Sequence, residues 1–156
     1  METQTEPGRT LVTEGEWAGW TRVDTDPFEM LSGPYYARWD DDGRCVCAFR
    51  AEAKHNNGGG FMHGGALMTF ADFALFCIAQ DALADSDGAV TVSMNTEFVG
   101  SARPGDLVEA TGEVVRAGGS LVFVRGQITS GGRTLVSVST VLKKNRRPTP
   151  AGTRAR

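Results

Sequence analysis

The chain has few cysteines, and their spacing is unlike that of a disulfide scaffold or a zinc site. It carries three, with Cys45 and Cys47 two residues apart and Cys77 in a long apolar segment. An odd number of cysteines without metal-ligand spacing is typical of reduced thiols. We therefore expect three free and mostly buried thiols, no metal site and a cytoplasmic protein.

Long hydrophobic runs and a leader-like beginning are also absent. No uninterrupted apolar segment is long enough to span a bilayer. Residues 1–6 are polar and acidic, without the basic and apolar regions of a signal peptide. The sequence therefore predicts neither a membrane-spanning segment nor a membrane partner.

Basic residues are scarce over most of the chain and concentrated near its end. Of 16 lysines and arginines, six lie within residues 143–156, which leaves 10 basic and 19 acidic residues elsewhere. A body with a net charge of −9 argues against nucleic-acid binding. The basic end could meet an anionic ligand, although a solvated terminal charge run is the simpler interpretation.

The length and the hydrophobic pattern fit one two-layer domain over residues 13–144. Residues 1–12 and the basic residues 145–156 are expected to be disordered tails. A strand pair over residues 35–51 precedes a long helix that reaches about residue 83, and a meander of four strands follows over residues 90–142. One apolar helix against one antiparallel sheet predicts an α+β fold whose sheet wraps the helix. Because one helix covers only part of such a sheet, we expect a homo-oligomer.

A short helix is predicted just before the strand pair. Asp26 is a helix N-cap, Pro27 fits the first helical position, and Glu29 fits the third. Gly33 is a stop signal. Together these residues predict a helix of little more than one turn.

The most informative stretch is a polar, glycine-rich loop that runs directly into the long helix. The loop, residues 55–65, contains both histidines of the chain, and the helix that follows over residues 66–79 is apolar except for Thr69 and Asp72. A helix that is apolar nearly all round is normally buried. A carboxylate on it is costly unless it is paired, hydrogen-bonded or lining a cavity. Asp72 is therefore the first candidate for chemistry, and a structural carboxylate paired within the fold or across an interface is the alternative.

The N-terminus of this helix is a second candidate, for stabilising negative charge. Gly64 and Gly65 should form the first turn, where the N–H groups lack partners within the helix and the dipole is positive. A carbonyl oxygen placed against the Gly64 N–H, beside His63, would be polarised as in an oxyanion hole. Asp72 lies eight residues further along, about 12 Å up the helix axis, too far for both groups to touch one carbonyl. A site shared with a second subunit follows from this distance as a hypothesis.

The loop and the helix also carry a family-like motif. Its order is asparagine-x-x-glycine-x-x-histidine-glycine-glycine over residues 57–65, with an aspartate nine residues after the histidine. Together with the strand over residues 90–98 and the segment Ser-Ala-Arg-Pro-Gly-Asp over 101–106, it resembles the hotdog-fold thioesterases of the phenylacetate-degradation (PaaI-like) and 4-hydroxybenzoyl-CoA thioesterase group. The resemblance covers about residues 40–143. It implies a hotdog fold, an antiparallel sheet wrapped around one long central helix, in a dimer or tetramer.

The resemblance also implies an activity, the hydrolysis of an acyl-CoA thioester to a carboxylic acid and free CoA. Asp72 would be the nucleophile or the base for water, and the Gly64 N–H the oxyanion donor with the His63 side chain beside it. Asn57 would orient the water or the thioester, and Thr91 would lie near the carboxylate. Such enzymes take the carboxylate and the threonine from one subunit and the asparagine and glycine from the other, and they need no metal or organic cofactor.

Simpler interpretations exist for most of these residues. His63 could only cap the helix, Asn57 could be a turn residue, and Thr91 an ordinary strand threonine. His55 fits a role in ordering the loop. A zinc site formed by the histidines and Asp72 lacks a compact ligand pair. The alternatives for the whole protein are a non-catalytic acyl-CoA-binding or regulatory module and, less well supported, an enoyl-CoA hydratase of the hotdog type. The acyl group stays open.

Overall fold

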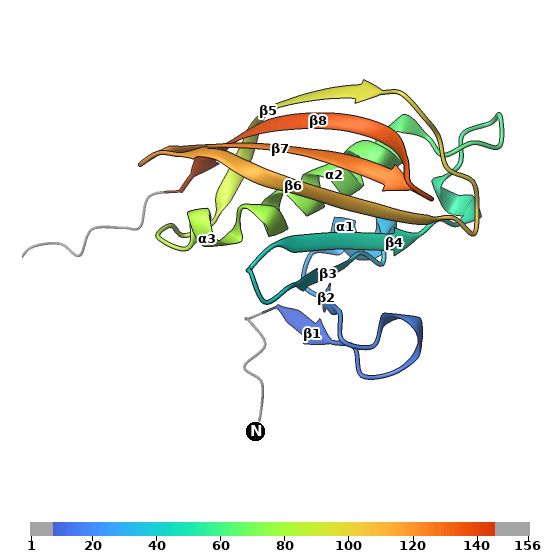
Figure 1. Ribbon diagram of the computed structural model, residues 1–156, viewed down its shortest axis with the longest axis horizontal. Coiled ribbons are helices and arrows are strands. Elements are labelled where there is room, and N and C mark those ends of the chain that lie inside the picture. The colour runs from blue at the N-terminus through green and yellow to red at the C-terminus, as the bar shows by residue number, and fades with distance from the viewer. Residues whose placement is uncertain (1–7, 146–156) are drawn as a thin grey trace, which may run out of the picture.

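The chain folds as one strongly curved antiparallel sheet around a central helix, α2 (Gly64–Ile78) (Figure 1). The computed structural model describes residues 8–145, so most of the two expected tails, 1–12 and 145–156, lies outside the described residues. The sheet has eight strands in the order β1-β2-β3-β4-β6-β7-β8-β5. The strands are β1 (Arg9–Leu11), β2 (Thr21–Val23), β3 (Tyr36–Trp39), β4 (Cys45–Arg50), β5 (Ala89–Phe98), β6 (Leu107–Ala117), β7 (Leu121–Ser130) and β8 (Arg133–Lys144). The predicted α+β architecture is confirmed.

The core lies between α2 and the concave face of the sheet. Phe70 and Phe73 of α2 are buried against Phe49 of β4 and Tyr35, with the Phe49 and Phe70 rings 4.6 Å apart between centroids. Burying each of these side chains stabilises the fold by about 1.5–3 kcal/mol. The three cysteines are free and buried in the same core, as expected. No helix within residues 8–145 has the length and apolarity needed to cross a membrane.

The long helix ends earlier than predicted. At Ala79 the backbone has φ −86° and ψ 3°, and a separate short helix, α3 (Gln80–Leu83), follows. The prediction of a single helix that reaches about residue 83 was therefore wrong. The apolar pattern continues across Ala79, so the sequence pattern alone did not reveal the break at this residue.

The strand order corrects the predicted meander. Strands β6, β7 and β8 do follow one another as antiparallel neighbours, but β5 crosses to the far edge and pairs only with β8 (Figure 1). The alternation of apolar and polar residues in a strand does not show which strand it pairs with. The strand order is set instead by where the chain leaves α2 and α3. The consequence is a ten-residue strand at the sheet edge.

A β-bulge in this edge strand interrupts the alternation of its side chains between the two faces. The register shifts between Thr91 and Ser93, so Thr91 lies opposite Leu142 and Met94 lies opposite Thr140. Both partners on β8 are buried toward α2, and therefore Thr91 and Met94 face the helix although they are three residues apart. Val90 and Val92 do not share the helix-facing side with Met94, because the bulge lies between Thr91 and Ser93. Their side chains are 49% and 52% exposed.

The N-terminal boundary of the domain also needs correction. Residues 9–11, predicted within a disordered tail, form β1 and pair with β2, which in turn pairs with β3. Such three-residue strands carry too little alternation to be recognised from a pattern. Tertiary contacts hold β1 in place, because the Arg9 guanidinium lies 5.1 Å from the centroid of the Trp39 ring and its Nη2 donates to Cys77 Sγ at 3.2 Å.

The predicted short helix is confirmed in detail as α1 (Pro27–Ser32). Asp26 Oδ1 accepts hydrogen bonds from the N–H groups of Phe28 and Glu29, at 3.0 and 2.9 Å. Gly33 ends the helix, and its N–H donates to the Glu29 carbonyl oxygen. The helix packs against α2 and thus lies beside the candidate carboxylate.

Candidate active site

The Asp72 carboxylate is half-buried on α2 and opens into a cavity of about 410 Å³. Thr91 Oγ1 donates a hydrogen bond of 2.6 Å to Asp72 Oδ1. The bulge in β5 makes this contact possible, because it turns Thr91 toward the helix. Three elements line the cavity: α1 and its cap contribute Asp26, Phe28 and Glu29, α2 contributes Met68, Thr69 and Asp72, and β5 contributes Thr91 and Met94.

The Thr91–Asp72 hydrogen bond gives a direct prediction. A hydrogen bond to a charged group contributes about 1.5–3 kcal/mol, and its loss leaves the carboxylate free to rotate. Thr91→Val, which keeps the shape, should therefore lower kcat for the expected thioester hydrolysis about tenfold. Thr91→Ser keeps the hydroxyl and should stay within about twofold of the wild type in the same steady-state assay. Equal activity of all three proteins would make Thr91 an ordinary strand residue.

Asn57 holds the glycine-rich loop through one side of its amide. Asn57 Oδ1 accepts from the N–H groups of Gly59 and Phe61, at 2.8 and 3.2 Å. The side-chain carbonyl of Asn57 therefore has the role of a turn residue, which was the simpler interpretation. The side chain is exposed, and because the carbonyl is fixed by two donors, the orientation of the amide –NH₂ is fixed as well. That –NH₂ can donate to a ligand.

His63 is the N-cap of α2. Its Nδ1 accepts from the Gly65 N–H at 2.8 Å, so a neutral ring carries its proton on Nε2. A Cβ at residue 65 would lie 3.0 Å from His63 Nδ1, which explains the glycine there. His63 therefore caps the helix, as the simpler interpretation expected. Its ring is exposed, and Nε2 can still donate a hydrogen bond.

The Gly64 N–H is the first donor of a 15-residue helix. Within residues 8–145 it has no hydrogen-bond acceptor, as expected for the first turn. The Phe98 ring, at the end of β5, packs against this glycine, and a Cβ here would lie 3.3 Å from its nearest carbon. The N–H is therefore held beside β5 at the positive end of the α2 dipole.

The structure separates the predicted residues into two groups within the chain. Asp72 and Thr91 share a cavity near the start of β5, whereas Asn57, His63 and Gly64 do not line it. Gly64 lies instead against the other end of β5, at Phe98. The two groups of candidate residues, called half-sites below, thus lie at opposite ends of one edge strand. The two groups are separate because Gly64 and Asp72 lie eight residues apart on one helix.

His55 links the loop to α1. It is 4% exposed, its Nδ1 accepts from the Glu52 N–H at 2.9 Å, and its Nε2 donates to the Ser32 carbonyl oxygen at 2.7 Å. These contacts agree with a role in ordering the loop. They also fix α1 over the Asp72 cavity.

Sequence reasoning missed Glu29, which lines the cavity beside Asp72. Its position as the third residue of the predicted short helix was explained by the capping pattern alone. No sequence signal distinguishes a carboxylate that faces solvent there from one that faces inward. Only the packing of α1 on α2 shows its direction.

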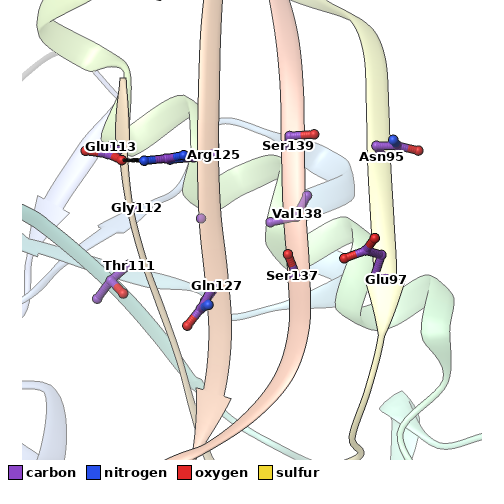
Figure 2. A pocket seen from close by; sticks show the side chains of 11 residues that line it. Asn95, Glu97, Thr111, Gly112, Glu113, Arg125, Gln127, Ser137, Val138 and Ser139 are labelled. Atoms are coloured by element: carbon purple, nitrogen blue, oxygen red, sulfur yellow. Dashed lines mark hydrogen bonds and ion pairs between the residues drawn. The ribbon is translucent and has the colours of Figure 1, made fainter. Parts of the chain in front are cut away.

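A larger hollow of about 700 Å³ lies elsewhere, over the outer face of the sheet. Figure 2 shows its side chains on β6, β7, β8 and β5, including the ion pair between Arg125 and Glu113. Register places its polar side chains, such as Arg125, Gln127 and Ser139, on the opposite face of the sheet from Val124 and Thr140, which face α2. None of the predicted site residues lines this hollow. It is a polar outer surface, separate from the Asp72 cavity.

Comparison with known proteins assigns the chain to a family. A sequence model of the thioesterase superfamily matches residues 59–137, about half of the chain. A Pseudomonas aeruginosa protein whose name calls it an esterase is 35% identical over 117 residues, which are 75% of this chain and 87% of that protein. The chain belongs to the thioesterase superfamily. This membership supports thioester hydrolysis and hence a hydrolase.

Other members of the superfamily agree in sequence and in fold. Human acyl-coenzyme A thioesterase 13 is 29% identical over 107 residues, 66% of this chain and 73% of the human protein. The Escherichia coli PaaI protein from the phenylacetic acid degradation operon superposes with a TM-score of 0.67 at 21% identity, over 78% of this chain and 86% of that one. The hotdog fold and the PaaI-like resemblance of this thioesterase-superfamily member are thereby confirmed.

Proposed function

We propose that this protein hydrolyses acyl-CoA thioesters at an active site completed by two subunits. The observation that carries the proposal is the Thr91–Asp72 pair, a half-buried carboxylate oriented by a 2.6 Å hydrogen bond at the mouth of a cavity. The cavity, about 410 Å³, lies within the range of small-molecule sites. Human acyl-coenzyme A thioesterase 13, by its name, acts on acyl-CoA, and this supports the same substrate class here.

The chemistry follows from the two half-sites. The Gly64 N–H, at the positive end of α2, donates to the thioester oxygen and stabilises the negative charge that develops there. The His63 Nε2–H lies next to it, and the Asn57 –NH₂ orients the water or the thioester. Asp72 then either attacks the carbonyl carbon itself or takes a proton from a water molecule whose oxygen attacks that carbon.

The edge strand explains how two subunits would assemble the site. An unpaired ten-residue edge with two exposed valines is a template for pairing with another chain. Two copies of β5 related by a two-fold axis perpendicular to the strands run antiparallel. The Thr91 end of one strand then meets the Phe98 end of the other. Asp72 of one copy is thereby brought to Gly64 of its partner, since Thr91 marks the first half-site and Phe98 the second.

Complementation between two inactive variants tests the shared site. Asp72→Asn and Gly64→Pro each remove one half-site, so each variant alone should be nearly inactive. When the two are co-expressed, half of the dimers are mixed, and each mixed dimer has one intact site. We expect about a quarter of the wild-type specific activity to return, measured as free thiol released from acyl-CoA.

The matched control places both changes in one chain and mixes it with wild-type subunits. If the site is shared, the mixed dimer has no intact site and only wild-type dimers are active. If each subunit instead holds a complete site, the two co-expressed single variants stay inactive, and the mixed dimer of the control keeps half of the activity of a wild-type dimer. This outcome would overturn the shared site while leaving thioester hydrolysis in place.

A further inference from the structure

The short helix α1 turns a carboxylate toward the protein interior while its apolar side chains stay largely exposed. Phe28, Met30 and Leu31 are 61%, 56% and 75% exposed. Glu29 is half-buried and lines the cavity that contains Asp72. Turning a carboxylate rather than a leucine toward the protein interior costs free energy. This arrangement indicates that the inward position of Glu29 serves the cavity.

Three anchors hold Glu29 in this position. Asp26 caps the N-terminus of α1, and the Ser32 carbonyl at its end accepts the 2.7 Å hydrogen bond from His55. Lys54 Nζ donates to the Gly33 carbonyl oxygen just beyond. His55 and Lys54 belong to the segment that leads into the glycine-rich loop. The loop that carries one half-site thus also fixes α1 over the other.

The surroundings of Glu29 favour its protonated form. Burial raises the pKa of Glu29 to about 7, and the negative charges of Asp26, Cys77 and Asp72 act in the same direction. The Arg9 guanidinium on β1 opposes them. Around neutral pH the cavity therefore holds a carboxyl group that can donate a proton, beside a second carboxylate that accepts a hydrogen bond from Thr91. Two carboxyl groups in unlike environments are the arrangement that acid–base catalysis uses.

We propose that Glu29 is the general acid of this site and delivers a proton to the departing sulfur while Asp72 acts at the acyl carbon. The inference rests on the proposed function. Asp72 takes a proton from a water molecule while the oxygen of that water bonds to the acyl carbon. The C–S bond then breaks, and its electron pair stays on the sulfur. That sulfur takes the Glu29 proton, so the products are the acid and the thiol. The proton on Asp72 returns to Glu29 through solvent, and the site is restored.

The proposal has a pH signature. Below about pH 7 Glu29 carries the proton that it donates. As the pH rises through this value the proton is lost, and a second negative charge then opposes the oxyanion and the thiolate that develop beside it. The wild-type kcat/KM should therefore fall on the alkaline side, and Glu29→Gln should lack that descending limb.

The deciding experiment compares two thioesters of one acyl group, the CoA thioester and the 4-nitrothiophenol thioester. The nitrothiophenolate leaves readily without a proton, whereas the alkyl thiolate of CoA benefits from one. Glu29→Gln should lower kcat about 100-fold on the CoA thioester and less than about threefold on the aryl thioester. Glu113→Gln, which removes an exposed carboxylate on the outer face of the sheet, should match the wild type on both.

Each other outcome identifies a different failure. Equal losses on the two thioesters would make Glu29 a structural residue, and no loss on either would remove it from the reaction. In both cases an inactive Asp72→Asn variant would leave the proposed function standing. A wild type that hydrolyses neither thioester would overturn the proposed function itself. Folding is checked by Tm, which Glu29→Gln should raise at pH 8, because the native state then no longer buries an ionised carboxylate.

Discussion

Replacing Asp72 with asparagine is expected to lower kcat for acyl-CoA hydrolysis by about 1,000-fold while the protein stays folded. Asparagine has nearly the same shape, and its carbonyl oxygen can still accept the hydrogen bond from Thr91. An amide, however, can neither take a proton from water nor attack a carbonyl carbon under these conditions. Removing a half-buried charge also removes its desolvation cost, so stability should not fall.

Free-thiol release from a panel of acyl-CoA thioesters, together with Tm and direct binding of acyl-CoA, measures this effect. Asp41→Asn, in the exposed turn between β3 and β4, is the matched control and should match the wild type. Binding retained with turnover lost supports catalysis by Asp72, and unchanged kinetics would remove it from the mechanism. A wild type that binds acyl-CoA without releasing thiol would establish the non-catalytic module. Hydration of an enoyl-CoA would establish the hydratase alternative.

Gly64→Pro is expected to lower kcat by about 100- to 1,000-fold, the usual effect of losing one oxyanion donor. Residue 64 is the first position of α2, where proline is well tolerated because its missing N–H has no partner within the helix. His63, which precedes it, has φ −67° and ψ 135°, a conformation that a residue before proline adopts readily. The substitution therefore removes the N–H and leaves the helix start in place.

Gly64→Ala separates the loss of the N–H from crowding. Alanine places the same Cβ 3.3 Å from the Phe98 ring but keeps the donor. We expect Gly64→Ala to lose less than about tenfold in kcat, with both variants near the wild-type Tm. If alanine and proline cost the same activity, the contact with Phe98 matters and the oxyanion donor lies elsewhere. If proline costs nothing, the Gly64 N–H takes no part in the reaction.

Local features of the sequence were sufficient for several elements and for the choice of site residues. The signals at Asp26, Pro27 and Gly33 gave the limits of α1, since capping depends on neighbours within one turn. The glycine-rich loop and the lone carboxylate on an apolar helix singled out Asn57, His63, Gly64 and Asp72. The helix rise alone showed that Gly64 and Asp72 are too far apart to act on one carbonyl within one subunit.

The arrangement of these parts depended on contacts between distant segments. The alternation of side chains in β5 does not determine whether this strand lies beside β6 or at the sheet edge. The bulge that turns Thr91 toward Asp72 is visible only in the register between β5 and β8. The inward direction of Glu29 depends likewise on how α1 packs against α2. Capping, periodicity and turn chemistry act over a few residues and can be determined from the sequence. Strand order, register and the facing of a short helix are set by long-range packing, and these decided which side chains meet in the cavity.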